Sequence, residues 1–198
     1  KKIILFAFAS NDLSRSAKRL YKQAKNSNYY DEIKILSPKN FNKKMNKKFN
    51  LIKDMSNKRG YGYWFWKPDF LLKIMDEINL GDIIHYVDIG CHIQNKNSKF
   101  YEYLDLLIDS KKFILPFQYH LDKVKFSKDI IFSKREEFKY TKADLFDDFR
   151  FLDKKNVTHT SQFWAGSFFI KKQVETEDFI KEWIQFFENK FHLIDDSE

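Results

Sequence analysis

A continuous apolar run near the start of the chain constrains the fold most. Residues Ile3 to Ala9 carry no polar side chain, which is typical of a strand buried on both faces of a sheet. A helical pattern follows from about Leu13 to Lys25, with Asp12 as its expected N-cap, and Glu32 to Leu36 has the pattern of a second strand. Because strand, helix and strand alternate, the sequence predicts an α/β fold with a mainly parallel central sheet flanked by helices.

The same alternation continues along the chain. Helical patterns are found at 68–78, 98–110, 141–152 and 177–191. Strand patterns are found at 83–87, 113–117 and 163–170. Segments 41–57 and 123–139 show no clear pattern. Since no linker or internal repeat interrupts this order, we expect a single domain over residues 1–198.

The composition is that of a soluble globular protein. Of the 198 residues, 43% are hydrophobic and 32% are charged. No apolar run approaches the roughly 18 residues that a membrane span needs. The single cysteine, Cys91, excludes an internal disulfide and a zinc site built on several thiolates. These features together lead us to expect a cytoplasmic protein.

The chain is basic, with 36 Lys and Arg against 28 Asp and Glu and a net charge of +8. A positive field favours anionic partners such as nucleic acid, anionic lipid or phosphorylated substrates. The densest cluster contains five lysines, Lys43, Lys44, Lys47, Lys48 and Lys53. It is either a solvated basic surface or a patch for a polyanion or the anionic inner membrane face. We expect no nucleic acid partner, because no RNA-binding signature is present.

Several common nucleotide and hydrolase motifs are missing. The sequence has no Gly-rich loop ending in Lys-Ser or Lys-Thr, and no Gly-x-Gly-x-x-Gly after the first strand. It also lacks a His-Glu-x-x-His zinc motif and a Gly-x-Ser-x-Gly nucleophile elbow. These absences argue against P-loop enzymes, typical dinucleotide-binding enzymes, zinc proteases and α/β-hydrolases.

Asp88 is the residue that points most sharply to chemistry. It follows an apolar strand and precedes Gly90. Ligands of open α/β sheets bind at the carboxyl ends of strands, and a carboxylate there can hold Mg²⁺ or Mn²⁺ together with substrate phosphates. The alternative is an ordinary turn aspartate that hydrogen-bonds its own backbone.

Two aromatic segments are candidates for ligand binding. In the segment 59–68, Tyr63, Trp64 or Trp66 could stack on a base or a sugar, and Lys67 lies near a helix start, where phosphate is favoured. In the segment 161–166, Gln162 and Trp164 could bind a sugar, and Gly166 permits close approach. The alternative for both segments is that the aromatic side chains belong to the core.

Three blocks of sequence carry a resemblance to a known family. They are Arg-Gly-Tyr-Gly-Tyr-Trp-Phe-Trp-Lys-Pro at 59–68, Gly-Asp-Ile-Ile-His-Tyr-Val-Asp-Ile-Gly-Cys at 81–91, and Gln-Phe-Trp-Ala-Gly-Ser-Phe at 162–168. Their order resembles a group of bacterial GT-A-type glycosyltransferases found in capsule and lipooligosaccharide loci. The resemblance implies a GT-A-like, Rossmann-like domain that moves a sugar from a nucleotide-diphosphate donor to a glycan or lipid-linked acceptor.

The resemblance also implies roles for particular residues. Asp88 would act in catalysis and in binding Mn²⁺ or Mg²⁺, although its motif, Asp-Ile-Gly, offers one carboxylate only. The implied donor-binding residues are Ser10, Asn11, Arg59, Tyr63, Trp66, Lys67 and Gly90. The implied residues facing donor sugar or acceptor are Gln162, Trp164, Ala165 and Gly166. An inverting reaction also needs a carboxylate base, for which Asp144 is the candidate.

One departure from the family pattern concerns the end of the sequence. Such proteins usually continue past a segment like 192–197 into a His-Asp-Gln stretch that completes the site, whereas this sequence stops at Glu198. We therefore expect the C-terminal end of the domain to be missing. The alternatives to a transferase are a non-catalytic module that binds polyanions or a membrane surface, and an inactive structural relative.

Overall fold

The computed structural model describes residues 1–53, 59–95, 98–119, 124–125, 131–132 and 135–196. The chain divides into two compact units. The first unit contains Lys1–Leu115 and Gly166–Asn189, and the second unit contains Pro116–Ala165 and Lys190–Glu198. The single domain expected from the sequence stays a prediction.

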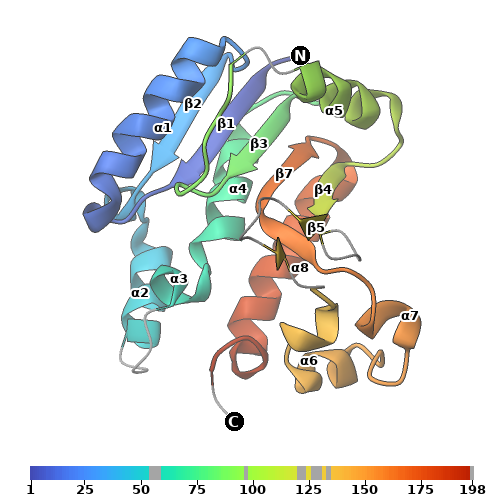
Figure 1. Cartoon of the computed structure of the whole chain (residues 1–198). Coiled ribbons are helices and arrows are strands. Elements are labelled where there is room, and N and C mark those ends of the chain that lie inside the picture. Colours follow the sequence, from blue (N-terminus) through green and yellow to red (C-terminus); the bar gives the residue numbers. More distant parts are fainter. Residues whose placement is uncertain (54–58, 96–97, 120–123, 126–130, 133–134, 197–198) are drawn as a thin grey trace. The chain divides into compact units, whose positions relative to one another are not determined.

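A five-stranded sheet organises the first unit (Figure 1). Its strands are β1 (Ile3–Phe8), β2 (Glu32–Leu36), β3 (Ile83–Val87), β4 (Ile114–Gln118) and β7 (Phe163–Lys171), in the order β2-β1-β3-β7-β4. β1 pairs in parallel with β2 and with β3, whereas β3 pairs with β7 in antiparallel orientation. The α/β class is confirmed, but the mainly parallel sheet is wrong because the sheet is mixed.

The direction of β7 explains this difference. A parallel strand needs a crossover connection that returns the chain to the starting end of the sheet, usually through a helix. Such crossovers precede β2 and β3. β7 instead runs back alongside β4, and the Lys171 N–H donates to the Phe113 carbonyl at 2.7 Å. The alternation of strands and helices in the sequence does not reveal this return.

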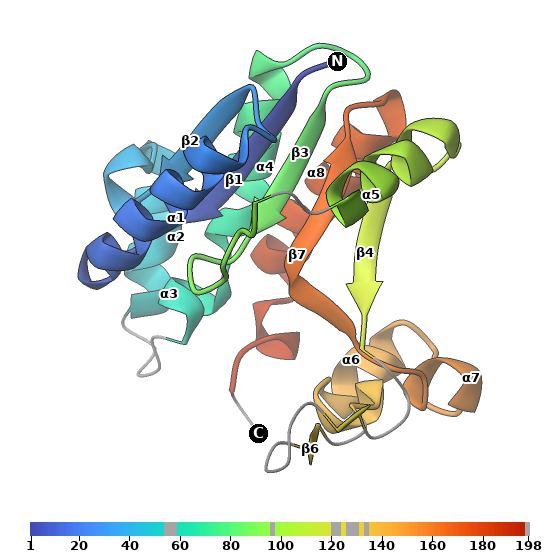
Figure 2. The ribbon, with the colours of Figure 1, turned by 45° about the horizontal axis from the view of Figure 1, so that its top comes forward.

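Helices cover both faces of the sheet. Those of the first unit are α1 (Ser14–Ser27), α2 (Lys43–Lys53), α3 (Gly60–Tyr63), α4 (Trp66–Glu77), α5 (Ser98–Asp109) and α8 (Val174–Asn189). Figure 2 shows α1 and α5 on one face and α4 and α8 on the other. None of the described helices is both long enough and apolar enough to cross a bilayer.

The alternation of side chains along β1 builds a core on both faces of the sheet. Leu5 and Ala7 pack against Leu20 of α1, while Phe6 and Phe8 meet Phe70 of α4, with ring centroids 6.1 and 6.0 Å apart. Successive strand residues point to opposite faces, so an apolar residue is required at every position. The burial predicted from the run at 3–9 is therefore confirmed.

The start of α1 differs from expectation. A short 3-10 helix, η1 (Asn11–Leu13), follows β1, and α1 begins only at Ser14. The N-cap of α1 is Leu13, so the prediction that Asp12 caps this helix is wrong. Because η1 intervenes, the Asp12 side chain is available for another role.

The second unit consists of short elements. They are β5 (Val124–Lys125), β6 (Ile131–Phe132), η3 (Glu137–Lys139), α6 (Ala143–Asp148), α7 (Lys155–Thr158) and η4 (Phe191–Leu193). The helix expected at 141–152 is thus shorter, because Arg150 adopts a left-handed conformation with φ of 57°. The N–H of Arg150 bonds to the carbonyl of Asp147, and the N–H of Phe151 to that of Phe146. This pair of bonds is a Schellman motif, which ends the helix.

Candidate functional site

A cavity of about 560 Å³ lies in the first unit, where β1 and β3 end. We call it the strand-end cavity. Phe8, Ser10 and Asp12 contribute to its wall from β1 and the turn after it, and Asp88 and Gly90 contribute from the turn after β3. β1 and β3 are parallel neighbours, so their carboxyl ends meet at one edge of the sheet. The expectation of a cavity at this edge follows a general rule for α/β sheets.

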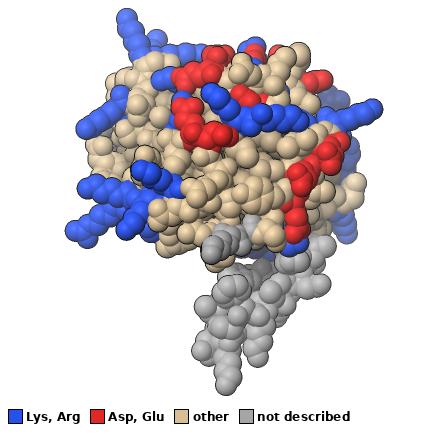
Figure 3. All heavy atoms as spheres, turned by 90° about the horizontal axis from the view of Figure 1, so that it is seen from above, with Lys and Arg blue, Asp and Glu red and all other residues tan. Residues whose placement is uncertain are grey.

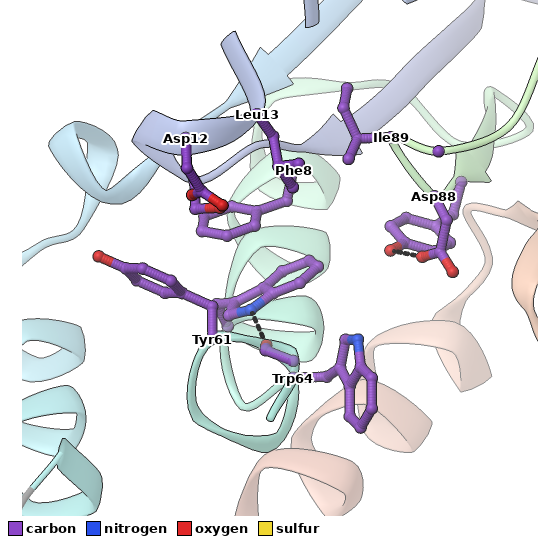
Figure 4. A pocket seen from close by; sticks show the side chains of 12 residues that line it. Phe8, Asp12, Leu13, Tyr61, Trp64, Asp88 and Ile89 are labelled. Atoms are coloured by element: carbon purple, nitrogen blue, oxygen red, sulfur yellow. Dashed lines mark hydrogen bonds between the residues drawn. The ribbon is translucent and has the colours of Figure 1, made fainter. Parts of the chain in front are cut away.

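Aromatic residues line the middle of the strand-end cavity. The rings of Phe8 and Trp66 stack with centroids 4.0 Å apart and an interplanar angle of 19°. The indole N–H of Trp66 donates to the Gly60 carbonyl at 3.1 Å, and Trp66 is only 4% exposed. Figure 4 shows Asp12 and Tyr61 on one side of Phe8, and Asp88 on the other. The cavity therefore has an aromatic centre between two carboxylates.

The Asp88 carboxylate is held by two partners on one oxygen. The Tyr86 hydroxyl donates to Oδ1 of Asp88, and Nζ of Lys67 lies 4.0 Å from the same oxygen. The ammonium of Lys67 also lies over the Tyr86 ring, 4.2 Å from its centroid. The Asp88 side chain remains 44% exposed. One carboxylate oxygen is thus anchored, and the side chain still faces the cavity.

Burial changes the proton affinity of the two anchoring groups. Desolvation lowers the pKa of Lys67 to about 8, and the nearby Asp88 charge opposes that change. Desolvation raises the pKa of Tyr86 well above its ordinary value, and the Asp88 charge adds to the effect. Tyr86 is therefore a neutral hydroxyl that donates a hydrogen bond at physiological pH.

Backbone hydrogen bonds fix the turn that carries Asp88. The Asp88 N–H donates to the Gly166 carbonyl at 2.8 Å, and the Cys91 N–H donates to the Asp88 carbonyl at 2.9 Å. The Arg19 guanidinium donates to the carbonyls of Ile89 and Cys91. The turn is thus closed by the Asp88 carbonyl, while the carboxylate bonds to Tyr86. The alternative of a carboxylate that only caps its own turn does not describe this geometry.

A left-handed turn forms another wall of the strand-end cavity. The five residues 60–64 all have positive φ, at 57° for Gly60, 55° for Tyr61, 90° for Gly62, 55° for Tyr63 and 60° for Trp64. A left-handed conformation costs an L-residue about 1–2 kcal/mol. Gly60 and Gly62 adopt it freely, and the other three residues are held in it by their packing.

The left-handed turn sorts its aromatic side chains between core and cavity. Tyr63 and the following Phe65 are 5% and 1% exposed. Tyr61 and Trp64 line the cavity, and Trp64 is 36% exposed. Among the three residues predicted to stack on a ligand, Trp64 therefore offers the most surface. Tyr63 points into the core and Trp66 contributes only a small area.

The remaining predicted donor-binding residues have different surroundings. Ser10 and Gly90 line the strand-end cavity, whereas Asn11 is exposed and does not line it. The guanidinium carbon of Arg59 lies 5.6 Å from the centroid of the Trp64 ring. Lys67 is 4% exposed and faces Asp88, so its ammonium supports that carboxylate and does not line the cavity.

The predicted acceptor-side residues belong mostly to the second unit. Gln162 exchanges backbone bonds with Arg135 and Tyr119, and Trp164 is 37% exposed. Ala165 is also exposed, as is Asp144 in the first turn of α6. Gly166 belongs to the first unit and bonds to Asp88. Their roles toward a substrate stay predictions.

Sequence reasoning missed several residues of the strand-end cavity, among them Asp12 and Tyr61. Asp12 follows β1 just as Asp88 follows β3, so the rule that ligands bind at strand ends would have found it. Its assignment to a helix cap hid this possibility. Tyr61 carried no signal of its own, because only the left-handed turn decides which aromatic side chains leave the core.

Asp88 is the residue that could hold a divalent cation. Within the described ranges, no group of three or more His, Cys, Asp or Glu side chains lies close enough to hold a metal ion. Mg²⁺ usually keeps several waters and binds through one or two carboxylates plus substrate phosphates. The cavity therefore fits a cation that is held jointly by Asp88 and a phosphorylated ligand. Its described side chains do not supply enough ligands to hold the cation without that ligand.

The lysine cluster of α2 is partly neutralised. Lys44 pairs with Glu188 at 2.9 Å, and Lys48 pairs with both Glu188 and Asp69. The side chain of Lys53 lies outside the described part of the structure. On the face that Figure 3 shows, basic and acidic side chains are interspersed. These ion pairs favour the interpretation of α2 as a solvated basic surface.

The sequence matches no protein-family model, and no curated protein gives a significant match.

Proposed function

We propose that this protein is a glycosyltransferase that uses a nucleotide-diphosphate sugar as donor and binds it in the strand-end cavity. The observation that carries the proposal is the cavity at the carboxyl ends of two parallel strands, with the anchored Asp88 carboxylate at its edge. The α/β class and the resemblance of the three sequence blocks to GT-A-type glycosyltransferases support it. The acceptor would be a bacterial surface glycan or its lipid-linked precursor.

The cavity has the features that this reaction needs. Transfer breaks the bond between the anomeric carbon and the diphosphate, and negative charge grows on the leaving diphosphate. A Mn²⁺ or Mg²⁺ ion held by Asp88 would stabilise that charge as a Lewis acid. Arg59, beside Trp64, supplies a cation for the phosphates. Tyr86 and Lys67 hold Asp88 so that its carboxylate faces the ligand.

The acceptor side of the proposal rests on the roles that the resemblance implies. Gln162, Trp164 and Ala165 would contact donor sugar or acceptor, and Asp144 would remove the proton from the acceptor hydroxyl in an inverting reaction. The net positive charge of +8 favours a site of action at the anionic inner membrane face. These assignments depend on the resemblance and on residue chemistry.

A donor-hydrolysis assay tests the proposal. Glycosyltransferases slowly transfer their sugar to water, so a panel of UDP-, GDP- and CMP-sugars with Mn²⁺, Mg²⁺ or EDTA identifies the donor without knowledge of the acceptor. We expect Asp88→Asn to lower the rate about 100-fold, the size typical for loss of one charge-stabilising group. The matched control is Asp76→Asn, which changes an exposed carboxylate of α4.

Each outcome of this assay is informative. Release of sugar from one nucleotide class, lost in Asp88→Asn and kept in Asp76→Asn, supports the proposal. Binding of a nucleotide sugar without any release indicates an inactive relative of the transferases. Absence of both binding and release, together with salt-sensitive binding to anionic vesicles, would replace the proposal by the membrane-surface alternative.

A further inference from the structure

The left-handed turn at 60–64 has an energetically unfavourable backbone conformation, although an ordinary turn could connect α2 to α4. Three of its five residues, Tyr61, Tyr63 and Trp64, are L-residues with φ between 55° and 60°. Such strain persists only where surrounding contacts enforce it, and it is frequent at ligand-binding elements. The question is which feature the strain maintains.

Core packing explains part of the turn. Tyr63 is buried, and the Tyr61 ring stacks on Phe49 with centroids 4.6 Å apart. Neither contact accounts for Trp64, which is 36% exposed at the wall of the strand-end cavity. The Trp64 side chain keeps about a third of its surface open to the cavity and solvent.

The position of the Trp64 ring is nevertheless well defined. It lies directly on Gly60, because a Cβ atom at that glycine would be only 2.4 Å from two atoms of the indole. Gly60 is thus required twice, once for its φ of 57° and once for the space that Trp64 occupies. The backbone N–H of Trp64 donates a hydrogen bond to the Gly60 carbonyl at 3.2 Å, which closes the turn beneath the ring.

The chemistry around Trp64 matches a nucleotide. The Arg59 guanidinium lies over the Trp64 ring, 5.6 Å from its centroid, so an aromatic ring and a cation are in contact at this wall of the cavity. A nucleotide offers both partners, a planar base and a phosphate. A neutral sugar would use the ring and leave the cation without a partner on the ligand. Asp12 and Asp88, which line the same cavity, can accept hydrogen bonds from hydroxyl or N–H groups.

We infer that Trp64 is the platform on which the base of the donor nucleotide stacks, and that the left-handed turn exists to present it. This inference rests on the proposed function and assigns one part of the donor to one side chain. Stacking of a base on an aromatic side chain typically changes affinity by about tenfold or more. Gly60 is then a positioning residue, since it acts through Trp64.

Nucleotide binding to Trp64 variants tests the inference. The probes are UDP, GDP, ADP, CDP and CMP, with inorganic pyrophosphate as a ligand that lacks a base and glucose as a ligand that lacks both base and phosphate. Dissociation constants are measured by calorimetry for the wild type, Trp64→Ala and Trp64→Phe. Circular dichroism and thermal melts establish that each variant is folded. Tyr21→Ala, which removes an exposed aromatic side chain from α1, is the matched control.

We expect Trp64→Ala to weaken the best nucleotide about tenfold and to leave pyrophosphate binding unchanged. Trp64→Phe, which keeps a ring, restores most of the affinity. The nucleotide also changes tryptophan fluorescence in the wild type, and this change disappears in Trp64→Phe. Gly60→Ala reproduces the loss seen in Trp64→Ala, and the double variant is no weaker than Trp64→Ala alone.

Failure of the inference differs from failure of the proposed function. If a nucleotide binds the wild type and Trp64→Ala equally well, the platform is refuted while the donor site stands. If Trp64→Ala loses binding of glucose but not of nucleotides, Trp64 is a saccharide platform and the inference is wrong. If no nucleotide binds the wild type, both the inference and the proposed function are overturned.

Discussion

The two units of this protein are built in different ways. The first unit has a five-stranded sheet with helices on both faces, and most of the fully buried large side chains, such as Tyr86, Phe6 and Phe70, belong to it. The second unit has short helices and a two-stranded ribbon. The buried hydrophobic residues described in the second unit are Phe146 and Leu193.

This difference shows where precise geometry can be maintained. The strand-end cavity and the anchored Asp88 belong to the first unit, where parallel strands and a dense core fix the ends of β1 and β3. Sites on rigid elements hold their side chains more exactly than sites on loops. A unit with few buried contacts opens more easily and can adapt to a ligand. The predictions below test this contrast.

The largest effect is expected from removal of core rings. Phe70→Ala should lower the free energy of unfolding by about 3–5 kcal/mol, because the ring is fully buried among other aromatic rings. Phe146→Ala in the second unit should cost less, about 1–3 kcal/mol. Urea unfolding of both variants measures the two losses. Equal losses would mean that the second unit is as well packed as the first.

A pH effect should arise from His85 of the first unit. Burial lowers the pKa of His85 to about 3, and its two ring nitrogens bond to the Tyr30 and Ser167 hydroxyls at 2.8 and 3.0 Å. The unfolded chain, with a histidine pKa of about 6.5, binds a proton that the folded chain does not. The His85 contribution to stability is therefore complete above about pH 6.5 and falls by about 1.4 kcal/mol per pH unit below it, toward pH 3.

Unfolding free energies between pH 7.5 and 5 measure this slope. The variant His85→Gln keeps a hydrogen-bonding side chain and should flatten the slope. His159→Gln changes an exposed histidine of the second unit and should leave the His85 contribution in place. A slope that survives in His85→Gln would assign the effect to other groups.

A smaller loss is expected when the left-handed turn is disturbed. Gly60→Ala places a Cβ 2.4 Å from the Trp64 ring at a φ of 57° and should cost about 1–2 kcal/mol. Gly90→Ala is the matched comparison, because its Cβ would meet nothing within 4 Å. Thermal melts should show a clear loss for the first variant and almost none for the second. If Gly60→Ala is neutral, the turn relaxes at no cost and the strain argument fails.

The smallest effect is a gain in the second unit. Arg150 adopts φ of 57° after α6, where glycine is the usual residue, so Arg150→Gly should stabilise the protein by about 0.5–1 kcal/mol. In the first unit, Asn28 ends α1 at a similar φ of 56°. Asparagine tolerates this conformation, and Asn28→Gly should change stability by a few tenths of a kcal/mol at most. A melting-temperature comparison of the two variants decides the point.

The periodicity of side chains predicted much of the first unit. The bounds of β2 and β3 follow the sequence pattern without error, and the inward residues of α4, such as Ile74 and Met75, are buried. In α5, Tyr101 is 53% exposed, whereas the adjacent Phe100 is buried. Adjacent positions on a helix are about 100° apart, so the packing of the helix decides which of the two is buried.

The candidate site was predictable only in part. Asp88 and Gly90 follow an apolar strand, and that position alone indicated a cavity at the sheet edge. The mixed sheet was not predictable, because local patterns do not specify the direction in which β7 pairs with β3. The burial of Tyr63 was not predictable either, because the run of positive φ values changes the directions in which successive side chains point.

The sequence by itself determined the α/β class and the placement of Asp88 at a strand end. These properties depend on periodicities of two and 3.6 residues, which act over a few neighbouring positions. Tertiary structure alone decided that Lys67 supports Asp88 and does not face the cavity, and that Trp64 is exposed there. Each of these facts depends on contacts between segments far apart in the chain, for which local pattern carries no information.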